Sequence, residues 1–261
     1  MTTPSPGVSR RQFLGRSAYN AAGLAAGLVG LTAAAASPSE TVRLGVIGVR
    51  RQGRKLAVEL ARQPDAEVVT LCDIDDAVLD RAIREVADSG PEPRRERDFR
   101  RLLDDPRIDA VVVATPDHSH AAIAVEALRA GKDVYLETPV CHTLGEASLL
   151  ADAAQRSGRV VQCGLFDRSL PHVRSAIEYV RSGRLGSVPL AKAWAVHRRA
   201  IGGPVTGSVE APAGVDYDAW LFPTPERPFD PLRFHRSWNA FWDYGSGELG
   251  AWGVALLDLA A

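Results

Sequence analysis

Residues 45–53 read Gly-Val-Ile-Gly-Val-Arg-Arg-Gln-Gly, and this stretch decides the fold. It ends an apolar run at residues 42–47 and leads into a helix-like stretch that continues to about residue 63. A turn from a buried strand into a helix presents unpaired N–H groups and the positive end of the helix dipole, which together suit a pyrophosphate. Asp73 stands about twenty residues after Gly53, where a carboxylate accepts hydrogen bonds from a ribose 2′-OH. The pattern predicts a site for NAD or NADP, and Asp73 favours NAD.

The glycine turn departs from the dinucleotide fingerprint G-x-G-x-x-G at its middle glycine. Gly48 and Gly53 occupy the outer glycine positions, and Arg50 occupies the middle one. The middle glycine lets the backbone approach the pyrophosphate, and a side chain there intrudes on that approach. Arg50 can instead turn outward and attract phosphate by its charge. We therefore predict that Gly48, Arg50 and Gly53 contact the cofactor and that binding is weakened but not abolished.

Apolar runs and helical patterns alternate along residues 41–165. Strands are predicted at residues 42–47, 67–73, 110–115, 134–137 and 160–164, and helices at residues 76–87, 99–103, 117–130 and 143–157. The Gly-Pro-Glu-Pro sequence at residues 90–93 ends one helix, and a polar loop rich in arginine is expected after it. This alternation implies a parallel sheet covered on both faces. The prediction is an α/β fold with a doubly wound Rossmann sheet over residues 41–165.

The character of the sequence changes at about residue 166. A helix is predicted at residues 171–182 and a long strand at residues 188–197, whereas residues 201–232 are rich in Pro and Gly. Aromatic residues and an apolar helix-like stretch occupy residues 238–261. Since about sixty irregular residues cannot build a generous core alone, we expect residues 166–261 to form an incomplete α/β second domain.

The N-terminus has the layout of an export signal. Arg10 and Arg11 precede Phe13-Leu14, and a run rich in Ala, Gly and Leu continues to Ala36. This order predicts a twin-arginine signal peptide over residues 1–36 and a periplasmic or extracellular mature protein. The alternative is a membrane anchor, since the run is nearly long enough to span a bilayer. Its weakly apolar composition favours a removed signal, so no stable membrane insertion is expected after processing.

Composition limits the classes of partner. The net charge of −1 over 261 residues argues against nucleic-acid binding, because nucleic-acid readers usually carry a basic face. Cys72, Cys141 and Cys163 lie far apart without metal-ligand spacing, so they are interpreted as buried apolar residues and no metal site is predicted. A small-molecule partner is expected, and a homo-oligomer stays open.

Four motifs point to one family. They are Ala-Thr-Pro-Asp-His-Ser-His at residues 114–120, Tyr-Leu-Glu-Thr-Pro at residues 135–139, Val-Arg-Ser-Gly-Arg-Leu-Gly at residues 180–186, and Phe-Trp-Asp-Tyr-Gly at residues 241–245 with Gly-Val-Ala-Leu-Leu-Asp at residues 253–258. In this order the chain resembles the exported branch of the Gfo/Idh/MocA family. The resemblance implies a Rossmann domain, a C-terminal α/β domain and NAD(P)-dependent oxidation or reduction of sugars, polyols and related small molecules. It also implies a C-terminal truncation, since family members continue further.

The resemblance assigns roles by position. It places Glu137 near the nicotinamide ribose and lines the cofactor side of the cleft with Thr115, Pro116 and His120. From the residues themselves, Asp117 is expected to cap the next helix, and His118 and His120 to make local hydrogen bonds. An aromatic set is expected to form core, with stacking on a sugar as the alternative: Trp220, Trp238, Trp242 and Tyr244.

The chain also departs from the family at its proton-transfer positions. Thr138 replaces the lysine of the family's Glu-Lys-Pro motif, and Ala251 and Ala255 replace an Asp and a His. Neither a hydroxyl without a pKa near neutrality nor a methyl group serves as general acid or base. Phe166 also replaces a frequent Gln, and the remaining candidates are Cys141, His142 and His197. Three hypotheses follow: an impaired oxidoreductase, a non-catalytic nucleotide- or sugar-binding relative, and a relative of NAD-dependent glycosidases.

Overall fold

The structure is a computed structural model that describes residues 41–196, 209–235 and 237–260. The predicted signal peptide at residues 1–36 and the candidate His197 lie outside the described residues, so both stay predictions.

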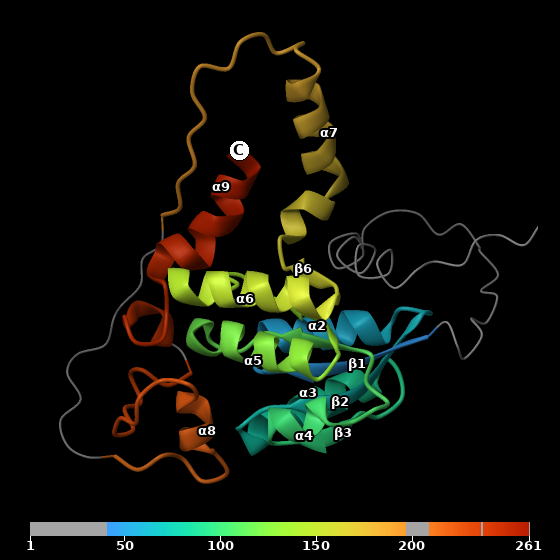
Figure 1. The fold of residues 1–261 in the computed structure, drawn as a ribbon, viewed down its shortest axis with the longest axis vertical. Coiled ribbons are helices and arrows are strands. Elements are labelled where there is room, and N and C mark those ends of the chain that lie inside the picture. Colours follow the sequence, from blue (N-terminus) through green and yellow to red (C-terminus); the bar gives the residue numbers. More distant parts are fainter. Residues whose placement is uncertain (1–40, 197–208, 236, 261) are drawn as a thin grey trace, which may run out of the picture.

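A single six-stranded parallel sheet organises residues 41–165 (Figure 1). Its strands are β1 (Val42–Ile47), β2 (Ala66–Cys72), β3 (Arg94–Glu96), β4 (Ala110–Val113), β5 (Asp133–Leu136) and β6 (Val161–Cys163). Their order is β3-β2-β1-β4-β5-β6, and every neighbouring pair is parallel. This is the strand order of dinucleotide-binding Rossmann sheets, whose ligands bind where the order reverses between β1 and β4. The predicted α/β class is confirmed.

Helices cover both faces of the sheet. α2 (Gln52–Ala61) and α3 (Asp76–Ala87) pack on one face, and α4 (Phe99–Leu103), α5 (Asp117–Arg129) and α6 (Leu144–Ser157) on the other. Successive strand side chains point to opposite faces. Val112 therefore joins the α2–α3 core, whereas Val111 and Val113 join the α4–α6 core. All-apolar strands such as β4 result from this double coverage.

The polar loop expected after residue 93 is wrong in part, because residues 94–96 form β3. Its residues pair in parallel with β2, from Thr70 opposite Arg94 to Cys72 opposite Glu96. β3 lies at the edge of the sheet, where charged side chains are common because one side of the strand faces solvent. Such a strand lacks the apolar pattern by which a buried strand is recognised.

The C-terminal part is mostly helical turns and irregular chain. Its elements are η1 (Phe166–Ser169), α7 (Pro171–Arg181), α8 (Tyr217–Leu221), η2 (Trp238–Ala240), η3 (Leu249–Gly253) and α9 (Val254–Ala260). The predicted strand at residues 188–197 is wrong over residues 188–196, which run as irregular, exposed chain away from the end of α7 (Figure 1). A strand needs a neighbour for its backbone groups, and no strand pairs with this stretch in the part of the chain that the structure describes.

Aromatic residues of the C-terminal part form a small core against the Rossmann sheet's helix α5. Trp220, Phe234 and Tyr244 are buried together, and the His118 ring lies 5.2 Å from both the Trp220 and the Tyr244 rings. Burial lowers the pKa of His118 to about 4, so its neutral ring donates Nε2–H to the Trp220 carbonyl oxygen at 2.9 Å. The core interpretation is confirmed for Trp220 and Tyr244 and wrong for Trp242, whose side chain is 90% exposed.

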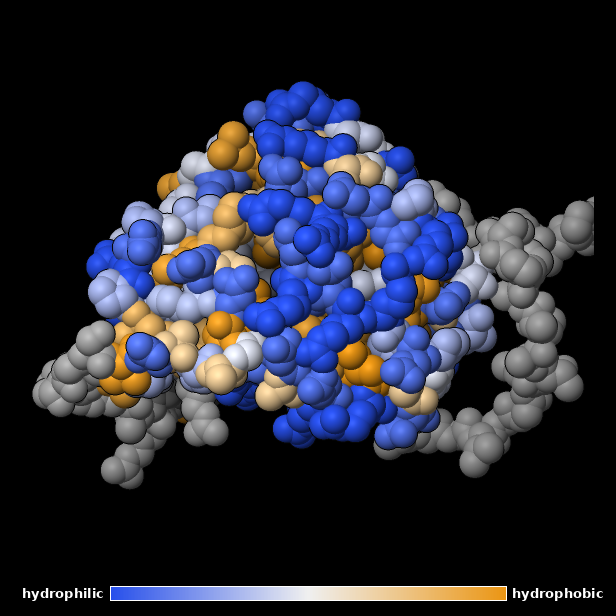
Figure 2. All heavy atoms as spheres, turned by 90° about the horizontal axis from the view of Figure 1, so that it is seen from below, coloured by the Kyte–Doolittle hydropathy of each residue, from blue (hydrophilic) through white to orange (hydrophobic). Residues whose placement is uncertain are grey.

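The side of the molecule that carries β3 and α4 is mainly hydrophilic, with apolar side chains in small separate patches (Figure 2). No described helix is both long and apolar enough to cross a bilayer. Cys72 is buried as expected, but Cys141 and Cys163 are only half-buried. Cys163 ends the edge strand β6, and Cys141 lies in the loop before α6, so neither is covered on all sides.

The substitution Gly53→Ala tests the packing of the glycine turn. A Cβ at Gly53 would lie 2.0 Å from the Gly48 carbonyl oxygen, so the turn must move to admit it. We expect the free energy of unfolding to fall by about 3 kcal/mol, the upper end of the usual cost of overpacking. Gly145→Ala is the control, because a Cβ there meets only Thr143 Oγ1 at 3.9 Å and should stabilise by about 0.4–1 kcal/mol. Denaturant unfolding measures both, and an unchanged Gly53→Ala variant would contradict the packing.

Candidate functional site

A large cavity opens at the carboxyl ends of β1, β2, β4 and β5, with a volume of about 1420 Å³. Ile47 and Gly48 line it after β1, Asp73 after β2, and Thr115 after β4. Ligand pockets usually enclose about 300–1,000 Å³, so this one has room for an extended ligand. It lies where the strand order reverses, the place at which Rossmann sheets bind nucleotides.

The structure gathers the sequence-predicted cofactor residues at this cavity. The residues that line it are Gly48, Arg50, Asp73, Thr115, Pro116, His120 and Glu137. Gly53 is the exception, because it packs behind the turn against the Gly48 carbonyl group. Seven of the eight predicted cofactor residues therefore line the cavity, and the eighth, Gly53, supports the turn from behind.

Gly48 fits a ligand that approaches the backbone closely. Its φ of +83° suits glycine, and a Cβ there would lie 2.8 Å from the backbone of Ala114. Its N–H donates to the Cys72 carbonyl oxygen at 2.8 Å, which holds the turn against the end of β2. The φ of Arg50 is negative, as expected for a residue with a side chain, because among the described non-glycine residues only His235 has a positive φ. The lost middle glycine thus adds a side chain without straining the turn.

Asp73 links the glycine turn to the turn after β2. Its Oδ2 accepts the Val49 N–H at 2.8 Å, and its Oδ1 accepts the Asp75 N–H at 3.2 Å. Burial raises the pKa of Asp73 to about 6, against the lowering effect of these two N–H groups. A carboxylate oxygen has more than one lone pair. Asp73 can therefore hold the turn and still accept a hydroxyl from the cavity.

Cationic side chains form much of the cavity wall, and the sequence prediction named only Arg50 among them. The lining cations are Arg50, Arg51, Arg54, Lys55, Arg81, Arg97 and Arg100. The lining also holds five acids, Asp73, Asp98, Asp117, Glu137 and Asp216, so the cations are in excess, and such an excess attracts the two phosphates of a dinucleotide. The arginine-rich sequence after residue 93 was a signal for Arg97 and Arg100 only, and its interpretation as a loop gave no reason to place them at the site.

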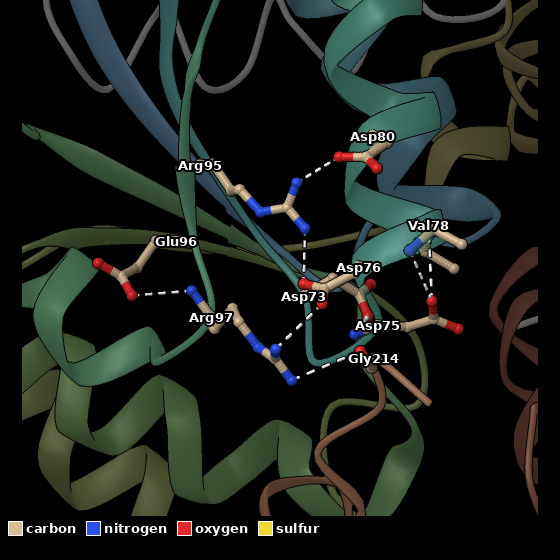
Figure 3. Close-up of polar contacts among 10 residues, drawn as sticks. Asp73, Asp75, Asp76, Val78, Asp80, Arg95, Glu96, Arg97 and Gly214 are labelled. Carbon is tan, nitrogen blue, oxygen red and sulfur yellow. Dashed lines mark hydrogen bonds and ion pairs between the residues drawn. The ribbon is translucent and has the colours of Figure 1, made fainter. Parts of the chain in front are cut away.

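Two arginines at the end of β3, Arg95 and the lining residue Arg97, brace the start of α3 and the turn before it (Figure 3). Arg95 forms ion pairs with Asp76 and Asp80, and Arg97 contacts Asp76 Oδ2 at 3.1 Å and the Gly214 carbonyl oxygen at 3.4 Å. The short edge strand β3 thus positions side chains over the start of α3. The arrangement fixes the end of the cavity nearest Asp73.

Asp117 and His120 have structural contacts at the opposite side of the cavity. The predicted helix cap at Asp117 is wrong: Pro116 is the N-cap, and Asp117 is the first helical residue, whose Oδ2 accepts the Ser246 N–H at 3.0 Å. Pro116 takes the extended conformation that begins the helix, so Asp117 is free to hold the C-terminal part. The local hydrogen-bonding role of His120 is confirmed, since its ring nitrogens lie 2.7 Å from Pro139 O and 2.6 Å from Thr115 O.

Glu137 and Thr138 line the cavity after β5. Glu137 Oε1 accepts hydrogen bonds from Gln52 Nε2 at 3.2 Å and Tyr135 OH at 3.4 Å, and burial raises the pKa of the Glu137 carboxyl. Thr138 shares the cavity with Ala251, whereas Ala255 is not among its lining residues. Two of the three family proton-transfer positions therefore meet at one cavity, with side chains that cannot transfer a proton.

The alternative proton-transfer candidates lie elsewhere. Cys141 and His142 are half-buried before α6 and do not line the cavity, and burial raises the pKa of the Cys141 thiol. Phe166 is 45% exposed in η1. Glu137 is the lining titratable group nearest in sequence to Thr138, and Asp117 and His120 also line the cavity.

The fold, the glycine turn and the buried acid after β2 define a dinucleotide-binding Rossmann protein. Residues 42–165 match the profile described as the oxidoreductase family, NAD-binding Rossmann fold, and residues 196–260 match the C-terminal alpha/beta domain of the same family. The chain belongs to the Gfo/Idh/MocA oxidoreductase family.

Curated relatives cover two kinds of protein. A glycosyl hydrolase family 109 protein of Stenotrophomonas maltophilia is 40% identical over 144 residues, covering 52% of this chain and 31% of the relative. Another, of Shewanella pealeana, is 31% identical over 171 residues, covering 58% and 38%. The uncharacterized oxidoreductase YrbE of Bacillus subtilis is 32% identical over 148 residues, covering 57% and 42%. The chain therefore spans well under half the length of these relatives.

Solved structures agree on the fold. Myo-inositol dehydrogenase from Lactobacillus casei, in complex with NAD(H) and myo-inositol, is 30% identical with a TM-score of 0.51, covering 56% of this chain and 43% of that one. GenD2 from gentamicin A biosynthesis, in complex with NAD, is 26% identical with a TM-score of 0.53, covering 60% and 43%. Both neighbours carry a nicotinamide dinucleotide, in keeping with the NAD-binding family to which the chain belongs.

Ionised Asp73 predicts that NAD binding weakens in acid. Burial raises the pKa of this carboxyl to about 6, and its protonation removes a charge-assisted acceptor for the ribose hydroxyl. Since only the ionised form binds well, we expect the Kd for NAD to rise about tenfold from pH 8 to pH 5. Calorimetric titration across this range measures it. Asp73→Asn is the control, with weak binding that stays flat with pH; a wild-type Kd that is constant from pH 8 to pH 5 would contradict the assignment.

Proposed function

We propose that the protein binds NAD in the cavity between β1 and β4, and that it prefers NAD to NADP. The observation that carries this proposal is the buried Asp73 carboxylate, held by Val49 N–H at the end of β2. In Rossmann folds a carboxylate at this place accepts the ribose 2′-OH, and it disfavours a 2′-phosphate by charge. Arg97 lines the same end, but its guanidinium is paired with Asp76.

We further propose that the substrate is a sugar, a polyol or a related small molecule. The inositol dehydrogenase among the structural neighbours supports this class. Trp238 and Trp252 line the cavity beside Ala251, and aromatic faces of this kind pack against sugar rings. A homo-oligomer is a further part of this proposal.

Hydride transfer is proposed to be impaired. Thr138 and Ala251 occupy the cavity positions where the family resemblance expects proton-transfer groups, and Ala255 lies outside the lining. A bound NAD supplies the hydride acceptor, but the reacting hydroxyl still needs a group that takes its proton. Glu137 is a carboxyl at this end, but the family resemblance places it near the nicotinamide ribose, and its hydrogen bonds are with Gln52 Nε2, Tyr135 OH and Thr138 N–H.

A second candidate is glycoside cleavage with bound NAD, because several relatives are glycosyl hydrolase family 109 proteins. It needs the same proton transfer at its start, so the replacements at Thr138 and Ala251 weaken it equally. A non-catalytic nucleotide- or sugar-binding protein is the third candidate, and it needs no proton-transfer group.

We also propose export through the twin-arginine pathway to the periplasm or beyond. Arg10 and Arg11 with the following apolar run support it. Because that pathway carries folded proteins, NAD acquired before export would travel with the protein.

Restoring the missing groups tests the proposed function. The triple variant Thr138→Lys, Ala251→Asp, Ala255→His should reduce NAD with a sugar or polyol about 10²–10⁴-fold faster than the wild type, the usual contribution of a positioned acid–base group. Absorbance of NADH measures the oxidation of sugars and polyols, and absorbance of the phenol released from aryl glycosides measures cleavage, which leaves no net NADH.

The control is the variant Thr138→Met, Ala251→Asn, Ala255→Asn, which adds side chains of similar size without useful proton transfer. Cooperative melting of all variants must precede the assay. Rapid turnover by the wild type, or equal rates for both triple variants, would overturn the impaired-oxidoreductase proposal.

A further inference from the structure

Residues 214–216 of the C-terminal part are built onto the turn that follows β2. Asp216 N–H donates to the Ile74 carbonyl oxygen at 2.9 Å, and Asp76 N–H donates to the Gly214 carbonyl oxygen at 3.1 Å. Asp75 and Val215 form an antiparallel bridge between these bonds. Figure 3 shows Gly214 beside Asp75 and Asp76. The segment that continues from here therefore begins next to Asp73.

His235 returns from this segment to the same turn. Its Nε2 lies 2.7 Å from Asp75 Oδ2, across 160 positions of sequence, and both side chains are largely buried. A carboxylate only accepts hydrogen bonds, so Nε2 carries the hydrogen. Burial lowers the pKa of His235, with Arg50 acting in the same direction and Asp75 against both. The neutral ring then presents Nδ1 as an acceptor.

The backbone of His235 is held in a conformation that non-glycine residues avoid. Its φ is +64°, in the left-handed region that is uncommon for non-glycine residues, although Asn, Asp and His enter it more often than the others. The ring lies 3.7 Å from the Phe234 ring between centroids, and Phe234 is buried in the aromatic core with Trp220. Such strain persists where surrounding contacts impose it, and it often marks a ligand clamp.

The imidazole also reaches the cavity. His235 is one of its lining residues, together with Gly48, Arg50 and Asp73, whereas Asp75 is not. The ring therefore lies between Asp75 and the space that adjoins the Asp73 carboxylate. The cavity thus has an acceptor from the Rossmann sheet and a second acceptor from the C-terminal segment.

We propose that His235 binds the adenosine ribose of the dinucleotide, accepting a hydrogen bond from a ribose hydroxyl while Asp75 fixes its orientation. The inference rests on the proposed binding of NAD. Asp73 and His235 both line the cavity and both contact Asp75. Two acceptors in this arrangement match a diol, which has two hydroxyl donors, and they match a phosphate poorly because a phosphate has no donor to offer. The C-terminal segment therefore contributes to cofactor affinity and closes the adenosine end of the cavity.

The test is calorimetric titration of wild type and His235→Asn with NAD, AMP and nicotinamide mononucleotide. Asparagine tolerates the left-handed backbone, so the variant removes the ring and leaves the turn. We expect the affinities for NAD and AMP to fall about three- to tenfold, the usual effect of one hydrogen bond. Binding of nicotinamide mononucleotide should not change. Arg227→Gln is the control, since it removes an exposed ion pair with Asp243 in the same segment, outside the cavity.

The titrations distinguish ribose binding by His235 from a purely structural role. Unchanged AMP affinity in His235→Asn would overturn the proposal while leaving NAD binding intact. Equal weakening of all three ligands together with a lower Tm would also overturn it, because it would show a purely structural role for the Asp75 pair. A wild type that binds neither NAD nor AMP would overturn the proposed function and this inference with it.

Discussion

The hydrogen bond from Val49 N–H to the Asp73 carboxylate is the interaction on which the site depends. It joins the glycine turn after β1 to the turn after β2 at 2.8 Å. Together with the Gly48 N–H bond to the Cys72 carbonyl oxygen, it fixes the separation of these two loops beside the point where the strand order reverses. The carboxyl is buried enough to have a pKa of about 6. One group thus holds the loop geometry and gives the cavity its charge near the expected ribose.

The C-terminal part extends this arrangement because several hydrogen bonds hold it to the Rossmann domain, three of them through side chains of the loops or helix starts. Asp117 accepts a hydrogen bond from Ser246 N–H, and His118 donates one to the Trp220 carbonyl oxygen. Asp75 accepts one from His235 Nε2. All three contacts lie in the loops that surround the cavity or at the first turn of a following helix. The aromatic core of Trp220 and Tyr244 then covers α5 where it faces the cavity. Residues far apart in sequence therefore form one wall.

Most of the Rossmann domain could be predicted because its signals are local. Asp75 and Asp98 cap α3 and α4 with their side chains, and each precedes an apolar pattern of helical period. Completely apolar strands such as β4 follow from coverage on both faces. β3 could not be predicted in this way, because an edge strand of Arg-Arg-Glu has no apolar period and is defined by its partner β2.

The same difference between local signals and distant partners separates the predicted from the unpredicted residues of the candidate site. Gly48 and Asp73 are recognised by their spacing from a strand and a helix, and both line the cavity. Asp117 was misplaced by one position, because Pro116 takes the extended conformation that begins the helix. His235 gives no signal in the sequence, since it follows the irregular stretch at residues 201–232 and its partner Asp75 is 160 positions away. Its role is visible only once the chain is folded.

We propose that the cavity between β1 and β4 binds a dinucleotide and that the side chain of Arg50 lowers its affinity. Calorimetric titration of NAD against wild type, Arg50→Gly and Arg51→Gly tests it most directly. Arg51 is the adjacent lining cation and occupies a fingerprint position where glycine is not required. We expect that the wild type binds NAD, and that Arg50→Gly, but not Arg51→Gly, binds it more tightly than the wild type. A wild type that does not bind NAD, or an Arg50→Gly variant that binds no more tightly than Arg51→Gly, would contradict it.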